Sequence, residues 1–219
     1  MNHGLQKAGG IAALATALAF LFVFALVATT LAPMTSPDLA FDEYLALHQA
    51  NETLIYVWHF TMYIIFGFCL TVVAIALHDR LKEASPAVSA IAMAIGLMYS
   101  AFVFLGGLLT IHGDEAVLAL AARDPAGAEG LHKTIAAITL CVDSSDRLLG
   151  CLWIGLASVA ALRTKAFPRV LAILGLVIGA PAVIGIAFPG LLAFSYVFGL
   201  GIIAWSAWLG IVMLRKAKA

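Results

Sequence analysis

The polar stretch Asp143-Ser144-Ser145-Asp146-Arg147 interrupts an apolar region, and the apolar run LLGCLWIGLASVAAL (148–162) follows it up to Arg163. At about 1.5 Å per residue, the helix from Arg147 to Arg163 is roughly 24 Å long. The hydrocarbon core of a bilayer is about 30 Å thick. If Arg163 marks one membrane face, Arg147 therefore lies several ångströms inside the other. Ionisable residues at that depth usually face a bundle interior or a watery cavity, so we expect any functional site here.

The composition indicates an integral membrane protein. Of the 219 residues, 63% are hydrophobic and 11% are charged, whereas soluble domains are about 45–50% apolar and about 25% charged. The three cysteines form no CxxC pair, so they give no disulfide framework and no zinc signature. Basic residues cluster only in short loops that membrane topology explains, and nothing in the sequence indicates nucleic-acid binding.

Six apolar segments are each long enough to cross a bilayer. They cover approximately residues 10–31, 53–77, 87–111, 135–162, 170–188 and 191–214, and Pro189-Gly190 predicts a tight turn between the last two. The first segment exceeds the usual 7–15 apolar residues of a signal peptide, so we expect a retained anchor. The sequence therefore predicts an all-α fold, with residues 1–219 forming one domain of six transmembrane helices.

The basic residues predict the orientation of these helices. Nine of the twelve Lys and Arg fall on one side of the predicted membrane: Lys7, Arg80, Lys82, Arg163, Lys165, Arg169, Arg215, Lys216 and Lys218. By the positive-inside rule, both termini are expected in the cytoplasm. Ten of the twelve carboxylates, from Asp38 to Asp146, then belong to the outer half.

Two outer connections show helix signals of their own. Ser36-Pro37-Asp38 reads as an N-cap followed by a proline at the first helical position. Apolar and aromatic residues then recur at helical spacing and predict a short helix at the membrane interface: Phe41, Tyr44, Leu45 and His48. In the other connection, Gly113-Asp114-Glu115 is expected to begin an alanine-rich helical stretch. Asp124-Pro125 predicts that the fourth helix starts well before its membrane portion.

Counting along the helices gives the polar stretch neighbours at the same depth. His59 precedes His78 by nineteen residues, and Tyr196 precedes Arg215 by nineteen, roughly 28 Å of helix in each case. Both are therefore expected near the outer boundary, at about the level of Asp146. The residues predicted to form this outer-leaflet pocket are His59, Asp143, Asp146, Arg147, Ser195 and Tyr196.

On the fourth helix the polar residues form one stripe. They recur at three- and four-residue spacing, which places them on one face: His132, Thr139, Asp143, Asp146 with Arg147, and then Gly150. Several ionised groups facing lipid would be costly, so we expect the stripe to face the bundle. Asp143 and Arg147 can pair within the helix, and His59 is the best candidate partner for Asp146. The alternative is an ion pair at the headgroup level, with His59 donating one hydrogen bond and Trp58 belonging to an aromatic belt.

The C-terminal part of the chain has a recognisable pattern. It contains the segments LLGCLW (148–153), AALR (160–163), FPRVLAILG (167–175), FGLG (198–201) and WSAWLGI (205–211). Over residues 143–214 this pattern resembles a widespread bacterial family of uncharacterised six-helix membrane proteins, classed as a domain of unknown function. The resemblance implies six helices in a bacterial cytoplasmic membrane and implies no activity.

Three classes of function fit the sequence. The first is a non-catalytic membrane protein, either an accessory subunit or a binder of a small or lipid-like ligand, with the lipid bilayer and a protein partner or a second copy as its partners. The second is a membrane-embedded enzyme or redox protein that uses His59, Asp143 and Asp146, with His59, His112 and Asp143 as candidate metal ligands. The third is a proton-coupled transporter, which the apolar inner half disfavours. The residue pattern identifies no cofactor.

Overall fold

The computed structural model describes residues 2–36, 38–164, 166–187 and 193–216, without the side chains of residues 35, 181–187, 193–198 and 216. The described part is all-helical. In chain order the elements are α1 (His3–Ala28), a 3₁₀ turn (Ala32–Thr35), α2 (Phe41–Ala50), α3 (Glu52–His59), a π-helical turn (Phe60–Ile65), α4 (Phe66–Leu81), α5 (Pro86–Ala121), α6 (Pro125–Thr164), α7 (Arg169–Ala187) and α8 (Ala193–Lys216).

Four of the described helices are long and apolar enough to cross a membrane. They are α1, the continuous helix Glu52–Leu81 that joins α3 to α4, α5 and α6. The first four predicted spans fall on these helices. The predicted spans 170–188 and 191–214 fall on α7 and α8, whose described apolar portions are the shorter segments Arg169–Ala180 and Gly199–Arg215. The predicted turn at Pro189-Gly190 lies outside the described residues.

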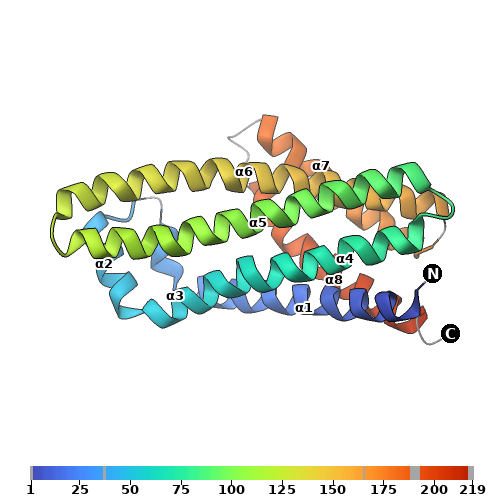
Figure 1. Cartoon of the computed structure of the whole chain (residues 1–219), viewed down its shortest axis with the longest axis horizontal. Coiled ribbons are helices and arrows are strands. Elements are labelled where there is room, and N and C mark those ends of the chain that lie inside the picture. Colours follow the sequence, from blue (N-terminus) through green and yellow to red (C-terminus); the bar gives the residue numbers. More distant parts are fainter. Residues whose placement is uncertain (1, 37, 165, 188–192, 217–219) are drawn as a thin grey trace.

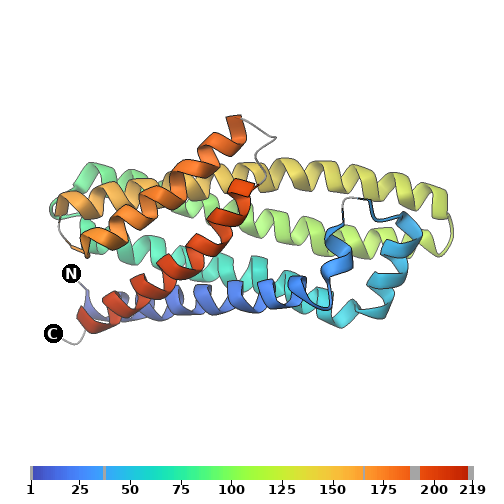
Figure 2. The same cartoon turned by 180° about the vertical axis from the view of Figure 1, so that it is seen from behind.

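The long helices run side by side in an elongated bundle (Figures 1 and 2). Helix α5 packs along α6, α1 packs between α4 and α8, and α7 contacts both α6 and α8. The start of α1 and the end of α8 lie at the same end of the molecule, where Gly10 of α1 faces Leu214 and Gly210 of α8. Helices α2 and α3 lie at the opposite end, beside the far portions of α5 and α6.

The two ends of the bundle differ in charge. The described basic residues at the first end lie where α4, α6, α7 and α8 begin or terminate: Arg80, Lys82, Arg163, Arg169 and Arg215. We call this the basic end. The second end contains α2, α3 and the connection between α5 and α6, and its described carboxylates include Asp42, Glu43, Glu52, Asp114, Glu115, Asp124 and Glu129. We call this the acidic end.

The helix signals in the sequence are partly confirmed. Helix α6 begins at Pro125, as expected, and the Asp124 Oδ1 atom accepts a hydrogen bond of 3.0 Å from the Gly127 backbone N–H. Helix α2 is present, but its N-cap is Ala40, so the start predicted at Ser36-Pro37-Asp38 is wrong. Helix α5 continues through Gly113-Asp114-Glu115, and therefore no new helix begins there. The polar residues that suggested a separate stretch lie instead within α5, toward its C-terminal end.

Small residues allow the helices to approach closely, as in many membrane bundles. A Cβ atom added at Gly107 of α5 would collide with the Cβ of Tyr63, and one at Gly175 of α7 would collide with the Ser158 hydroxyl of α6. At Gly179 it would lie 3.0 Å from the Cys151 carbonyl oxygen. At these glycines, helices therefore approach more closely than a larger side chain would allow.

Candidate functional site

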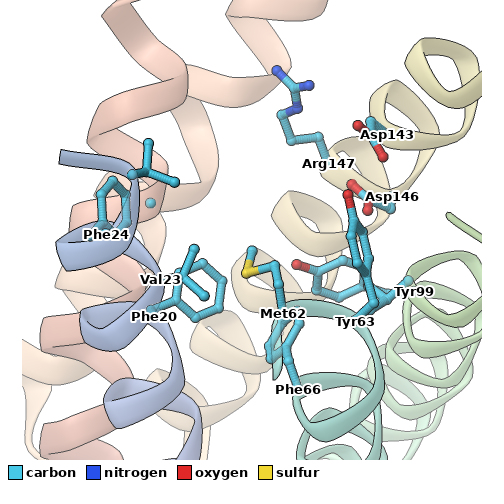
Figure 3. A pocket seen from close by; sticks show the side chains of 13 residues that line it. Phe20, Val23, Phe24, Met62, Tyr63, Phe66, Tyr99, Asp143, Asp146 and Arg147 are labelled. Carbon is cyan, nitrogen blue, oxygen red and sulfur yellow. The ribbon is translucent and has the colours of Figure 1, made fainter. Parts of the chain in front are cut away.

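Helix α6 presents its polar stretch to a cavity rather than to the outside. The spacing of Asp143, Asp146 and Arg147 places them on one side of α6, where they line a cavity of about 290 Å³ (Figure 3). Ser144, by contrast, is exposed, and its hydroxyl donates to the Leu140 carbonyl oxygen of its own helix at 2.7 Å. Among the described residues, the charged side chains of this stretch thus face the bundle.

The opposite wall of the cavity is apolar and comes mainly from α1. Phe20, Val23 and Phe24 recur at helical spacing and lie across from α6. Met62 and Phe66, from the π-helical turn and the first residue of α4, extend the same wall. The cavity therefore has one hydrocarbon side and one side with ionisable groups, which is the arrangement that an amphipathic molecule requires.

Two tyrosines add hydroxyl groups beside the carboxylates. Tyr63 and Tyr99 both line the cavity, and Figure 3 shows them next to Asp146. Tyr99 is only 3% exposed, and its hydroxyl group lies over Gly150, one helical turn after Asp146. A side chain at position 150 would collide with that ring, so Gly150 lets Tyr99 reach this depth. Gly107 does the same for Tyr63.

The π-helical turn at Phe60–Ile65 bears directly on the cavity. It inserts a wider turn into an otherwise α-helical segment, which changes the direction of the side chains before and after it. Met62 and Tyr63 both lie within it and both line the cavity. Such turns are frequent at functional sites, and here the turn brings an apolar and a polar lining residue to the same space.

Asp143 has a buried oxygen without a partner. Its Oδ1 atom is inaccessible and accepts no hydrogen bond within the described part of the protein. Its surroundings include Gly106 and Tyr63, because a Cβ atom added at Gly106 would lie 3.5 Å from this oxygen and 3.7 Å from the Tyr63 ring. A buried carboxylate oxygen is a strong acceptor, and leaving it unpaired is unfavourable. Asp143 thus lines the cavity while its Oδ1 atom lacks a donor from the described residues.

The expected partnership between His59 and Asp146 is wrong. His59 is buried, and its Nδ1 atom lies 3.7 Å from the Asp114 Oδ2 atom of α5. Asp146 lines the cavity with Tyr63 instead, and His59 is not among the lining residues. Counting residues gave the depth of His59 along its helix but not the direction of its side chain. In addition, α5 extends far enough to place Asp114 beside His59.

The candidate metal ligands are also not brought together. His112 is an exposed residue whose Nδ1 atom lies 3.0 Å from Glu115 Oε2, whereas His59 lies at Asp114 and Asp143 lies at the cavity. Within the described ranges, no three His, Cys, Asp or Glu side chains form a group that could hold a metal ion. The side chains of Ser195 and Tyr196 lie outside the described residues, although Gly199, further along α8, lines the cavity.

Some of the lining residues were not identified from the sequence. Tyr99 and the α1 residues Phe20, Val23 and Phe24 lie in continuous apolar segments, where an aromatic or aliphatic residue is typical of simple packing. A glycine at Gly150 on the polar stripe of α6 was the only available signal that a bulky group approaches there. His132, at the far end of the same stripe, packs against Tyr44 with ring centroids 4.2 Å apart.

The helices and their hydropathy define the class: this is a multi-pass, all-helical membrane protein. The chain belongs to a family described as a domain of unknown function, DUF4386, whose family model matches residues 8–217. The match covers nearly the whole chain and is not confined to residues 143–214. No protein of curated function and no solved structure matches the chain.

Proposed function

We propose that the chain crosses the bilayer six times, with its basic end in a bacterial cytoplasm and its acidic end outside. The support is the agreement between charge and architecture. The loop after α4 and the loop after α6 lie at the same end as the start of α1, and these are the regions rich in Lys and Arg. Helices α7 and α8 then supply the fifth and sixth spans.

Cysteine labelling tests this orientation. Ala84, between α4 and α5, and Ala126, at the start of α6, are exposed at opposite ends of the molecule. A membrane-impermeant maleimide added to intact cells should label Ala126→Cys and should label Ala84→Cys only after permeabilisation. Wild-type protein reports any labelling of the native cysteines. Equal labelling of both variants in intact cells, or the reverse pattern, would contradict the orientation.

We further propose that the cavity binds a small amphipathic, lipid-like molecule. One observation carries this proposal: a space of about 290 Å³ that has an apolar wall on one side and Asp143, Asp146 and Arg147 on the other. The volume lies near the lower end of small-molecule sites, roughly 300–1,000 Å³, so it fits a single apolar chain better than a whole two-chain lipid.

The polarity of the two walls sets the orientation of this ligand. An apolar chain would pack against Phe20, Phe24 and Met62, and a polar headgroup would lie between Asp146 and Arg147. A headgroup with a hydrogen-bond donor satisfies Asp143 and Asp146, and one with an acceptor also suits Arg147. The proposed function is therefore binding of the ligand and includes no chemical reaction.

Photo-cross-linking tests the proposal. Purified protein is illuminated with a fatty acid that carries a diazirine on its chain, and the labelled peptides are identified by mass spectrometry. We expect labelling of α1 near Phe20 and of Met62. Val23→Trp should fill the cavity and reduce this labelling by about tenfold, which corresponds to ~1.4 kcal/mol of binding free energy.

A matched control lies on the same helix. Leu18 is 66% exposed on the outer face of α1, so Leu18→Trp adds the same side chain without entering the cavity. It should leave cross-linking at Met62 unchanged. Labelling that is indifferent to Val23→Trp, or that concentrates around Leu18, would show that the fatty acid meets only the outer surface and would refute the proposal.

A further inference from the structure

A second cavity, of about 340 Å³, opens at the acidic end between α3 and α5. Its polar lining consists of His48, Glu52, Thr53, Tyr56, His59, Asp114 and Glu115. Its apolar lining includes Ile55, Ile111 and Leu118. It shares no lining residue with the cavity at Asp146, and it is therefore a separate site with different chemistry.

Asp114, one of the lining residues, contacts three other side chains at this second cavity. Its Oδ1 atom accepts a hydrogen bond of 2.8 Å from the Tyr44 hydroxyl of α2. Its Oδ2 atom lies 3.4 Å from His48 Nε2 and 3.7 Å from His59 Nδ1. Burial, reinforced by the nearby Asp114 charge, raises the pKa of Tyr44, so the phenol stays protonated and remains a donor. One oxygen of Asp114 is thus held in place, and the other faces two imidazoles.

Beside the cavity itself, the buried ring nitrogens of His48 are an independent indication of a ligand. Its side chain is only 6% exposed. Both ring nitrogens are buried and make no hydrogen bond in the described part of the chain, although Nε2 is near Asp114. A neutral imidazole has one donor and one acceptor nitrogen, and buried polar groups are normally paired. Because His48 Nε2 lies 3.4 Å from Asp114 Oδ2, a donor group that binds this oxygen would also lie near the imidazole nitrogen.

The charged residues of the lining indicate which charge a ligand of this cavity carries. Three carboxylates line the cavity, from Glu52, Asp114 and Glu115, and no Lys or Arg is among the lining residues. An anion would meet three carboxylates there and no Lys or Arg side chain to offset them. Tyr56, which is 52% exposed, adds an aromatic ring that can also attract a cation. The site is therefore suited to positive charge.

The size and the apolar wall distinguish an organic cation from a bare metal ion. A space of about 340 Å³ far exceeds the volume of an ion, and Ile55, Ile111 and Leu118 offer it no ligand atoms. The described residues also contain no group of three side chains placed to hold a metal. We propose that this cavity binds a small organic amine whose ammonium group donates to Asp114 and His48 and whose apolar body packs on the isoleucines.

Isothermal titration calorimetry on the purified full chain in detergent tests this site. The probe is benzylamine, and benzyl alcohol and benzoate are its neutral and anionic counterparts. Benzylamine should bind, whereas benzyl alcohol and benzoate should bind at least about tenfold more weakly. Asp114→Asn should weaken benzylamine binding by about tenfold or more, and Glu52→Gln should weaken it several-fold. Thermal unfolding of each variant shows whether it is folded.

Two controls separate this site from other causes. Glu129→Gln removes a carboxylate at the same end of the molecule that pairs with Lys133 at 2.6 Å and does not line the cavity, so benzylamine binding should be unchanged. Val23→Trp should also leave it unchanged, because the site does not depend on the cavity at Asp146.

Four outcomes would overturn the proposal. The first is that benzylamine does not bind. The second is that benzyl alcohol binds as tightly as benzylamine. The third is that folded Asp114→Asn and Glu52→Gln both retain full affinity for benzylamine. The fourth is that Zn²⁺ binds stoichiometrically, displaces benzylamine and loses its own binding when His48 and His59 are replaced, which would make this a metal site.

Discussion

The half of the bundle next to the basic end and the half next to the acidic end are built differently. Between the basic end and the level of Phe66, two cavities lined by described residues measure only about 10 Å³ each. Toward the acidic end the cavities measure about 290 and 340 Å³. The first half is a filled core, and the second holds space lined by ionisable groups. Binding is therefore expected in the second half, on a scaffold that the first half stabilises.

In the basic half, aromatic rings from one helix pack directly against glycines of the neighbouring helices. Trp153 of α6 packs on Gly96 of α5, and its ring lies 5.7 Å from that of Trp205 of α8, centroid to centroid. Gly175 of α7 approaches the same Trp205. In the acidic half, α5 and α6 continue beyond α8, so fewer helices are available to fill the space (Figure 2).

The largest effect should follow from removing the ring at the centre of the packed half. Trp153→Ala deletes a side chain that is 3% exposed and leaves a cavity between α5, α6 and α8. We expect a loss of about 3–5 kcal/mol in unfolding free energy, measured by denaturation in detergent. Trp208→Ala is the control, because Trp208 is 36% exposed. Equal losses in the two variants would show that this half is not a tightly packed core.

A glycine substitution tests the boundary between the halves. A Cβ atom in Gly107→Ala would collide with Tyr63 near its backbone, so rotation of the tyrosine ring cannot relieve it. We expect a destabilisation of about 1–3 kcal/mol, together with weaker fatty-acid cross-linking. Gly155→Ala has nothing within 4 Å of the added atom. That control should raise stability by up to about 1 kcal/mol, since alanine favours helix; stabilisation of both variants would contradict the proposed close approach.

The smallest effect should come from the acidic half. Tyr44→Phe removes the hydroxyl that donates to Asp114 and leaves the ring in place. Because Asp114 retains partial solvent access, we expect a loss of about 1 kcal/mol or less in thermal unfolding. Tyr56→Phe, at a tyrosine that is 52% exposed, should have no measurable effect. A loss for Tyr44→Phe as large as that for Trp153→Ala would remove the distinction between a rigid and an adaptable half.

Sequence patterns predicted the helices better than the contacts between them. Composition and apolar length gave the all-helical membrane class, and Asp124-Pro125 correctly marked the start of α6. The depth of Asp143 and Asp146 along their helix correctly predicted that both face the bundle, because charged groups are costly against lipid. These features depend on local chemistry, which the sequence contains.

The contacts within the two cavities depend on helix length and helix rotation, which cannot be obtained by counting residues along the sequence. The pairing of His59 with Asp114 requires knowing how far α5 extends and which way each helix is rotated. The π-helical turn at Phe60–Ile65 shifts that rotation and has no reliable sequence signal. The apolar wall around Phe20 became visible only when α1 was placed opposite α6.

The most direct test is an experimental structure of the protein in a lipid bilayer, with the cavity at Asp146 well resolved. We predict elongated density that runs along Phe20 and Met62 and ends in a polar group within hydrogen-bonding distance of Asp143 or Asp146. The same structure of Val23→Trp should lack that density. A wild-type cavity that contains only discrete water-sized density, or one that is closed by side chains, would contradict the assignment of this space to an amphipathic ligand.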